Sequence, residues 1–415
     1  MENEDKIVIR GLRDVAAAET KISFVDPIGA LYYYGYNIDD IVEHVCHEEV
    51  IHLLLHGRLP SKQELADFRS LLVSEMELPD SLIDSIKAAP KDCHPMEILR
   101  TEVSHLSYYD TNRNDRSKKA NKRRAMQLVA KVPAIVATLH RVQSNQQVIA
   151  PNEELGFAEN FLYMFRGKPA DSEEKIAIDR IMALHADHGF NASTFAARVT
   201  ASTNSDIYSA VTSAIGTLKG PLHGGACEKV MYMLDDIDTE EEVEEYIQGM
   251  LDDQKKIMGF GHRVYQTEDP RAKHLRCIAE NLCHRANTLD LYNLCIKIED
   301  VVHERKKIFP NVDFYAAVTL DALGVTSKFF TPFFASSRIS GWVAHVIEQY
   351  EDAVLLRPSS KYVGDYEKPF VPIEQRQTTA ELASANGDRK KKEKQKANSF
   401  TSVSPSSLLQ QSLSA

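Results

Sequence analysis

Helical periodicity runs through most of this 415-residue chain and restricts the fold more than any other feature. From Ile38 onward, apolar residues recur at intervals of three and four, which gathers them on one face of a helix. Residues 40–55 form one such segment, which Gly57 and Pro60 end. Another follows Ser61-Lys-Gln-Glu64, the capping-box pattern of a helix start. Further segments cover residues 122–142, 174–185, 206–218, 239–256 and 312–323. The sequence therefore predicts a mainly α fold.

Strand signals are confined to one stretch near the amino terminus. Residues 21–25 and 30–34 are rich in β-branched and aromatic side chains, and the turn-forming Asp26-Pro-Ile-Gly29 lies between them. We expect one small β-hairpin here and helices elsewhere.

Charge and composition exclude several classes of protein. The formal net charge of -11 opposes broad nucleic-acid binding, because a phosphate backbone would be repelled. No apolar run is long enough to cross a bilayer, and the acidic amino-terminal sequence lacks the apolar core of a signal peptide. The six cysteines include no C-x-x-C pair, which argues against a disulfide framework or a structural zinc site. We expect a cytoplasmic protein with small-molecule partners, no nucleic acid and no membrane.

The carboxyl-terminal residues 379–415 differ from the rest in composition. They are rich in Ala, Ser, Asn and Gln, and they contain a basic run at residues 389–396. Such a segment cannot bury enough apolar surface to order itself, so we predict a disordered tail. The basic run can be read as a docking patch for an anionic partner, although composition favours a solvated tail.

Polar residues and glycines cluster between His185 and Lys361 at positions that helix packing does not require. Taken singly, each cluster has a structural explanation: His188 as a core histidine, Asp313 as a helix cap, Arg357 as a surface ion pair. A glycine beside a histidine, however, lets the backbone approach a ligand and leaves the imidazole uncovered. The clusters are His185-Ala-Asp-His188 with Asn191, Gly220-Pro-Leu-His-Gly-Gly225, Gly259-Phe-Gly-His-Arg-Val-Tyr265 with Asp269-Pro-Arg271, Asn311-Val-Asp313, Ser336-Ser-Arg338 and Leu356-Arg357-Pro358.

A metal site is one reading of these histidines and aspartates. His185-Ala-Asp-His188 does not have the i, i+4 spacing of a zinc-binding helix, and the neighbouring arginines would repel a cation. Gly259-Phe-Gly261 also lacks the length and the Lys-Ser/Thr of a phosphate-binding loop. We therefore predict no metal.

The mixture of arginines, histidines and one aspartate suits a substrate with two carboxylates and a carbonyl group. Arginine binds carboxylates through two parallel hydrogen bonds, and a neutral histidine can polarise a carbonyl oxygen. A carboxylate base beside neutral donors is what proton abstraction next to a thioester requires. The residue types indicate carbonyl chemistry.

These segments closely resemble the citrate synthase family, and the likeness extends from about Leu12 to Tyr366. Gly-Pro-Leu-His-Gly-Gly, Gly-Phe-Gly-His-Arg-Val-Tyr with Asp-Pro-Arg, Asn-Val-Asp and Leu-Arg-Pro-Ser-Ser-Lys-Tyr-Val-Gly occur in the family order. The resemblance implies an acyltransferase that condenses acetyl-CoA with oxaloacetate and water to give citrate and CoA. It also implies that acetyl-CoA is a co-substrate and that no cofactor is bound permanently.

The resemblance implies three catalytic residues. His223 matches the histidine that hydrogen-bonds the acetyl carbonyl and stabilises the enol, Asp313 matches the base, and His262 matches the histidine that polarises the keto group of oxaloacetate.

Four further residues match those that hold the dicarboxylate: His188, Arg271, Arg338 and Arg357. In this family the last arginine enters from the partner subunit, so the resemblance implies a homodimer.

The CoA contacts are also implied by the resemblance. The loop Gly259, Phe260 and Gly261 matches the segment that receives the adenine, and the candidates for the phosphate contacts are Lys256, Arg263 and Lys361.

The implied architecture is a citrate synthase-like two-domain helical fold. Residues 1–222 and 331–378 would form a large domain, and residues 223–330 a small domain inserted between them. Closure of the small domain would exclude water while the enol forms.

Two alternatives remain open. 2-Methylcitrate synthase uses propionyl-CoA with the same catalytic residues, and one methylene is worth only about 1–3 kcal/mol in a pocket. Pro221-Leu222 favours citrate synthase, because methylcitrate synthases often carry a basic residue at the second position. A catalytically silent helical binding protein would be expected to lose His223, His262 or Asp313, and all three are present.

Overall fold

The computed structural model describes residues 7–12, 14–376 and 378. They belong to two compact units, one of Asp14–Pro358 and one of Met1–Arg13 with Ser359–Ala415. In the second unit the described elements are two short 3-10 helices, Arg10–Leu12 and Ile373–Gln375. The predicted tail at 379–415 lies outside the described residues.

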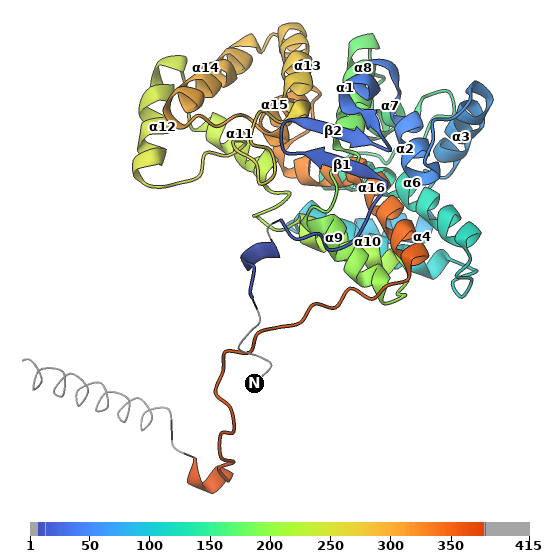
Figure 1. Ribbon diagram of the computed structural model, residues 1–415. Helices are drawn as coiled ribbons and strands as arrows, with labels where there is room; N and C mark the ends of the chain where they lie inside the picture. Colours follow the sequence, from blue (N-terminus) through green and yellow to red (C-terminus); the bar gives the residue numbers. More distant parts are fainter. Residues whose placement is uncertain (1–6, 13, 377, 379–415) are drawn as a thin grey trace, which may run out of the picture. The chain divides into compact units, whose positions relative to one another are not determined.

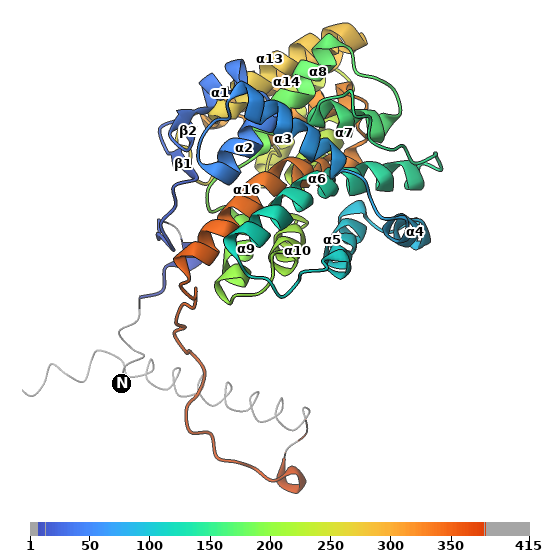
Figure 2. The ribbon, with the colours of Figure 1, turned by 90° about the vertical axis from the view of Figure 1, so that its right-hand side faces the viewer.

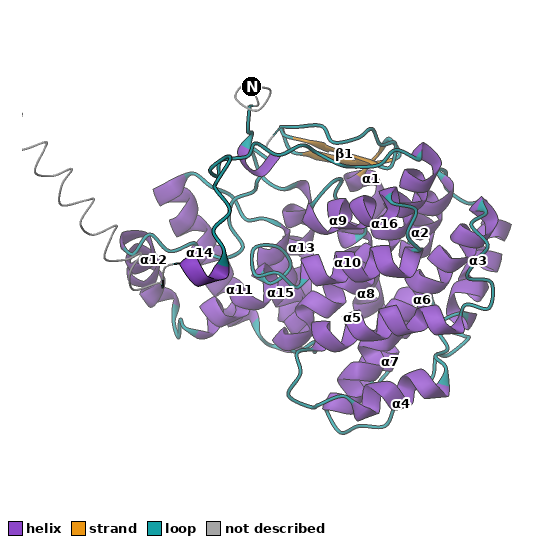
Figure 3. Ribbon diagram, turned by 90° about the horizontal axis from the view of Figure 1, so that it is seen from below, coloured by secondary structure: helices purple, strands orange, loops and turns teal. Residues whose placement is uncertain are grey.

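Helices make up nearly all the regular structure of the first unit, as Figure 3 shows. The predicted mainly α fold is confirmed. The helices (Figure 1) are α1 (Ile38–His44), α2 (His47–His56), α3 (Lys62–Ser74), α4 (Asp80–Ala88), α5 (Pro95–His105), α6 (Lys118–Gln143), α7 (Phe157–Arg166), α8 (Ser172–His185), α9 (Ala192–Ser202), α10 (Ile207–Leu218), α11 (Ala226–Asp235), α12 (Val243–Asp252), α13 (Pro270–Ala286), α14 (Leu289–Lys306), α15 (Val312–Ala322) and α16 (Phe330–Asp352). Short 3-10 helices lie at Leu106–Tyr109, Glu240–Glu242 and Ser327–Phe329. Among the described residues, no helix is both long and apolar enough to span a bilayer.

The predicted hairpin forms from β1 (Ser23–Asp26) and β2 (Ala30–Tyr33), which pair antiparallel with Asp26 opposite Ala30. A third strand, β3 (Tyr36–Asn37), adds to β2 and had no clear sequence signal. The turn closes through a 3.0 Å hydrogen bond from the Gly29 amide to the Asp26 carbonyl, with Gly29 at φ +101°. The Gln266 amide donates to the Pro27 carbonyl at 2.9 Å, so this turn contacts the loop between α12 and α13.

Two predicted helices are divided in the structure. The segment 40–55 is α1 and α2, because Cys46 is extended and starts a new helix: its amide donates to Glu49 at 2.9 Å, and the next amide donates to Asp179 at 3.0 Å. The segment 239–256 is a 3-10 turn followed by α12. The capping box at Ser61 is confirmed, since the Ser61 amide donates to the Glu64 carboxylate at 2.8 Å and the serine oxygen accepts from the Glu64 amide.

Helix α16 is buried along most of its length. It runs beside α6 (Figure 2) and also contacts α8, α9 and α10. Its last turns carry polar groups into this core, where Arg198 of α9 donates to Glu348 at 2.6 Å and to Gln349 at 3.0 Å. His345 lies 3.3 Å from both Arg198 and Asp187, so α16 is tied to α9 and to the loop after α8.

Helices α11 to α15 gather on one side of the first unit in Figure 1. They pack mainly on one another, with α15 against α11 and α13, and α14 against α12 and α13. The division into domains at residues 222/223 and 330/331 stays a prediction.

Gly341 lies where α16 approaches the loop after α8, with its amide donating to the Ala186 carbonyl at 3.1 Å, and it gives a stability prediction. An added Cβ at this position would collide with the Ala186 carbonyl and with the Asp187 carboxylate. Because this core cannot move freely, we expect Gly341→Ala to lower the free energy of unfolding by about 1–3 kcal/mol in urea denaturation.

The matched control is Gly249→Ala in α12, where an added Cβ meets nothing within 4 Å. This change should raise the free energy of unfolding by about 0.5–1 kcal/mol, because alanine favours a helix. Equal effects of the two substitutions would contradict the close approach at Gly341.

Candidate active site

Two of the sequence clusters are joined by backbone pairing. The segments 259–261 and 309–311 run antiparallel, with 2.8 Å from the Asn311 amide to the Gly259 carbonyl and 2.9 Å from the Gly261 amide to the Phe309 carbonyl. The Asn311 side chain closes the pair by donating to the Gly261 carbonyl at 2.9 Å. Gly259 is required, since its φ is +79° and an added Cβ would lie 2.9 Å from Phe314.

Asn311 also starts α15, because its side-chain oxygen accepts from the Asp313 amide at 3.0 Å. Asp313 therefore lies in the first turn of a helix whose start is attached to the Gly259 loop. Its carboxylate is half-buried and makes no hydrogen bond with another described residue. Burial raises the pKa of Asp313 to about 6, against the opposing charge of Arg271. Such a carboxylate is a stronger base than an exposed one.

Asp269 connects Arg271 to the start of α15. Its carboxylate accepts from Arg271 Nε at 2.9 Å, from Arg271 Nη2 at 2.7 Å and from the Val312 amide at 3.2 Å. Burial opposes ionisation, yet the Arg271 charge keeps the pKa of Asp269 below its ordinary value. Burial also acts on Arg271, but Asp269 raises its pKa, so both groups are charged.

The backbone fixes which nitrogen of His262 carries the proton. Nδ1 accepts from the amides of Val264 at 3.0 Å and Tyr265 at 3.1 Å, so Nε2 carries the hydrogen. Burial, with the charge of Arg271, lowers the pKa of His262 to about 4. His262 is thus a neutral imidazole with Nε2–H as its donor.

His223 is fixed in the opposite tautomer. The Ser193 amide can only donate, and it lies 3.3 Å from Nε2 of His223, so Nδ1 carries the proton. The Ser193 hydroxyl is 2.8 Å from the same Nε2, and it also accepts from the indole N–H of Trp342 at 3.1 Å. Burial, with the charge of Arg338, lowers the pKa of His223 to about 4. The turn after His223 needs Gly224, where a Cβ would lie 2.5 Å from the Leu218 carbonyl.

Arg338 of α16 is a buried guanidinium whose charge lacks a direct partner. Nε donates to the His185 carbonyl at 2.6 Å, and the guanidinium lies 4.6 Å from the centre of the Phe334 ring. Within the described part of the chain, no carboxylate lies within ion-pair distance of it. Burial lowers the pKa of Arg338 to about 10, which leaves it positive at neutral pH. The group is suited to an incoming carboxylate.

His188 is buried, and Nε2 lies 3.0 Å from the hydroxyl of Tyr265. Its ring centre is 5.1 Å from that of His262. Burial, with the charges of Arg271 and Arg338, holds the pKa of His188 well below its ordinary value. His188 is therefore a third neutral imidazole.

Six of the predicted residues thus act on one another. The charges of Arg271 and Arg338 reach His188 and Asp313, Arg271 reaches His262, and Arg338 reaches His223. The arrangement combines neutral N–H donors, two guanidinium groups and one carboxyl group of raised pKa. It can stabilise a developing oxyanion while a nearby carboxylate removes a proton.

The other predicted residues are not among these six. Arg357 is exposed, and no hydrogen bond or ion pair joins it to another described residue. Lys256 and Arg263 are exposed, and Lys361 belongs to the second unit. Phe260 is half-buried, with its ring centre 4.6 Å from that of Phe314.

Sequence reasoning missed three residues that hold the others. Asp269 and Tyr265 lie inside recognised motifs, and an acidic residue two positions before an arginine was a usable signal for Asp269. Ser193 carries no sequence signal, because its role depends on the contact between α9 and the turn at His223.

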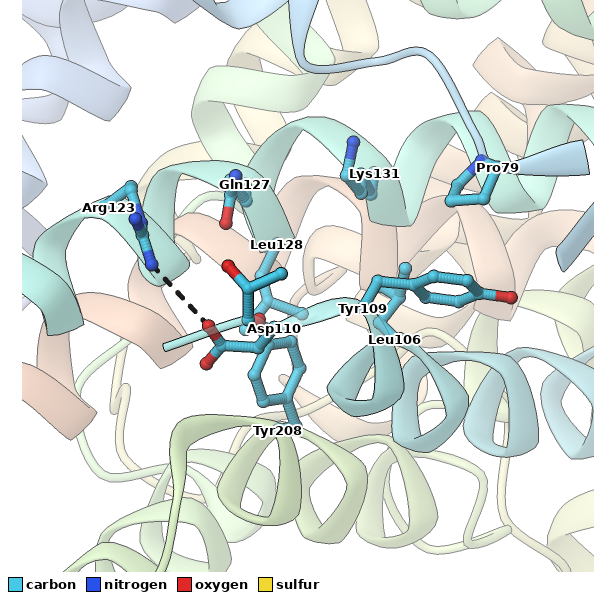
Figure 4. Close-up of a pocket in the computed structure, with 10 residues that line it drawn as sticks. Pro79, Leu106, Tyr109, Asp110, Arg123, Gln127, Leu128, Lys131 and Tyr208 are labelled. Carbon is cyan, nitrogen blue, oxygen red and sulfur yellow. Dashed lines mark ion pairs between the residues drawn. The ribbon is translucent and has the colours of Figure 1, made fainter. Parts of the chain in front are cut away.

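The hollow drawn in Figure 4 lies elsewhere, between α6, α10 and the Leu106–Tyr109 turn, and has a volume of about 140 Å³. Its acidic group, Asp110, is already paired with Arg124 at 2.5 Å and with Arg123 at 3.5 Å. None of the recognised clusters lines it. Within the described residues, no group of three or more His, Cys, Asp or Glu side chains could hold a metal ion.

Known proteins match the chain over most of its length. Residues 11–359 match the family described as citrate synthase, C-terminal domain. Citrate synthase 2 of Bacillus subtilis (strain 168) is 46% identical over 368 residues, which cover 88% of this chain and 99% of that protein. A second protein of the same strain, named citrate/2-methylcitrate synthase, is 42% identical over 356 residues, 85% of this chain and 96% of that protein.

A solved structure also matches. It is the ternary complex of carboxymethyl coenzyme A and oxaloacetate with citrate synthase from the thermophilic archaeon Thermoplasma acidophilum. The two chains are 34% identical, and the TM-score is 0.85 over 89% of this chain and 100% of that one. The fold, the motifs and these similarities together show that the chain belongs to the citrate synthase family.

Proposed function

We propose that this chain condenses acetyl-CoA with oxaloacetate and water, giving citrate and CoA, through the cluster around Asp313. The observation that carries the proposal is the pairing of two neutral histidines in opposite tautomers with a carboxyl group whose pKa is raised to about 6. A thioester enolisation needs such a base and such donors together.

The first step is removal of a proton from the acetyl methyl group by the Asp313 carboxylate. Nδ1–H of His223 donates to the thioester carbonyl oxygen, where negative charge develops. A neutral donor of this kind stabilises the enol without a second charge that must be desolvated. Burial of Asp313 favours proton uptake, because it penalises the carboxylate more than the acid.

The second step joins the enol carbon to the keto carbon of oxaloacetate. Nε2–H of His262 hydrogen-bonds to the keto oxygen, which takes the electron pair of the C=O bond as the new C–C bond forms and the thioester carbonyl is restored. This oxygen gains one proton to become the hydroxyl of the product, and the proton that Asp313 removed in the first step balances it. Arg271, Arg338 and His188 hold the two carboxylates, together with Arg357 from the partner subunit. Water then replaces CoA at the thioester carbonyl, and CoA leaves as the free thiol.

The acyl preference is the finer part of the proposal. Because one relative is named citrate/2-methylcitrate synthase, propionyl-CoA is the alternative acyl donor. Thiol release with oxaloacetate, measured with acetyl-CoA and propionyl-CoA at matched concentrations, tests the choice. A clear propionyl preference would reverse it.

Asp313→Asn tests the base. Asparagine is nearly isosteric but cannot take up the proton, so condensation should slow by about 10² to 10⁴. Oxaloacetate binding, measured by calorimetry, should change little, because it depends on the arginines and His188. Near-normal turnover would refute the role of Asp313.

Asp321→Asn is the matched control, because Asp321 is an exposed carboxylate on the same helix, α15, and the substitution is chemically the same. Its turnover should stay within about twofold of wild type. Loss of oxaloacetate binding in the Asp313 variant alone would mean that Asp313 holds substrate instead.

The pH dependence follows from the same carboxyl group. Asp313 acts as a base only when ionised, so kcat/KM for acetyl-CoA should fall as the pH drops through about 6. His223 and His262 stay neutral down to about pH 4 and do not contribute there. Bound oxaloacetate adds negative charge near Asp313. This charge raises the pKa of the carboxyl group and moves the fall in kcat/KM to higher pH. A rate that stays flat down to about pH 5 would contradict the assignment.

Subunit mixing tests Arg357. Arg357→Ala and Asp313→Ala chains should each be inactive, whereas a mixed dimer contains one site with both residues. After subunit exchange, activity should recover to about a quarter of wild type, because half of the dimers are mixed and each has one intact site. No recovery despite mixed dimers seen by native mass spectrometry would count against a shared site.

A further inference from the structure

The backbone on both sides of His188 is held by groups that have no part in the proposed chemistry. The hydroxyl of Tyr33 in β2 accepts from the Asp187 amide at 3.2 Å and donates to the Asp187 carbonyl at 2.9 Å. The Asp187 carboxylate accepts from the Gly189 amide at 3.0 Å and from the hydroxyl of Ser23 in β1. The main chain is therefore fixed, and only the side-chain torsions of His188 remain to be set.

The hydroxyl of Tyr265 is the group that can set them. It lies 3.0 Å from Nε2 of His188, and it is the one side chain of another described residue that hydrogen-bonds this imidazole. The two rings meet edge to face with centres 5.5 Å apart. Tyr265 itself is buried, with 5% of its surface exposed, so its hydroxyl has little freedom to turn away.

The same residue also contacts the second histidine of the site. The Tyr265 amide donates to Nδ1 of His262 at 3.1 Å, and the two ring centres are 4.5 Å apart. Burial raises the pKa of Tyr265, so the phenol keeps its proton over the working range of pH. One residue thus reaches His262 through its backbone and His188 through its side chain.

We propose that Tyr265 is a positioning residue for oxaloacetate, whose hydroxyl orients the imidazole of His188 toward the substrate carboxylate. The inference rests on the proposed function, in which His188 holds the dicarboxylate. Because His188 is assigned to oxaloacetate alone, the effect of the hydroxyl falls on oxaloacetate and not on acetyl-CoA.

Tyr265→Phe removes only the hydroxyl and keeps the ring packing and the amide bond to His262. The dissociation constant of oxaloacetate, measured by calorimetry, should rise about three- to tenfold, the effect of one lost hydrogen bond. KM for acetyl-CoA should stay within about twofold and kcat within about threefold. An unchanged dissociation constant for oxaloacetate would overturn the proposal.

The matched control is Tyr350→Phe in α16, because the Tyr350 hydroxyl donates to the Ser205 carbonyl at 2.6 Å. It should lower the melting temperature without changing oxaloacetate binding. If Tyr265→Phe behaves like this control, or weakens both substrates equally, Tyr265 is structural only.

If Tyr265→Phe weakens oxaloacetate binding, a double-mutant cycle with His188→Asn decides whether the hydroxyl acts through His188. If Tyr265 acts through His188, then Tyr265→Phe should have less than about a twofold effect in the His188→Asn background. Additive losses would show that the hydroxyl acts independently of His188. Failure of the wild-type enzyme to bind oxaloacetate would refute the proposed function instead, and it is measured first.

Discussion

Burial of α16 is the constraint on which the rest of the first unit depends. Among the described residues, the charge of Arg338 has no direct partner. The other polar groups of a helix buried on nearly all sides still need partners, because an unpaired buried charge costs several kcal/mol. Glu348 and Gln349 meet this need by accepting from Arg198 of α9. Nδ1 of His345 accepts from Arg198, so Nε2 carries the hydrogen and donates to Asp187. The same bonds that satisfy the core thus hold the loop that carries His188.

A second constraint acts at the start of α15. The Gly259 and Asn311 segments pair through their backbones, and Asp269 bonds both Arg271 and the Val312 amide. Asp313, His262 and Arg271 are therefore attached to one small group of main-chain hydrogen bonds. Such an attachment keeps their spacing fixed, and close positioning is what a condensation between two bound substrates needs.

The sequence allowed the fold class, the hairpin and each motif to be predicted, because these depend on local patterns. Capping at Ser61 is read from four neighbouring residues. The structural reading of Asp313 as a helix cap was wrong, because Asn311 caps α15 and Asp313 lies in its first turn. The sequence did not reveal the break between α1 and α2. The hydrogen bond from the first amide of α2 to Asp179 joins residues 132 positions apart. For the same reason the sequence did not reveal that Ser193 contacts His223 or that Tyr33 contacts Asp187. Residues whose roles arise from contacts between distant helices leave no pattern in the chain.

Electrostatics explains why the histidines can act as neutral donors. Arg271 is neutralised by Asp269, but Arg338 has no such partner and is balanced at longer range by Asp187 and Asp313. Burial opposes protonation of His188, His223 and His262, and the charges of the two arginines add to this effect. A dianionic substrate offsets the arginine charges when it binds. Because desolvation still disfavours imidazolium, the donors remain neutral, whereas the bound dianion and the burial both favour protonation of Asp313. The charge distribution therefore favours the proton transfer to Asp313 that we propose.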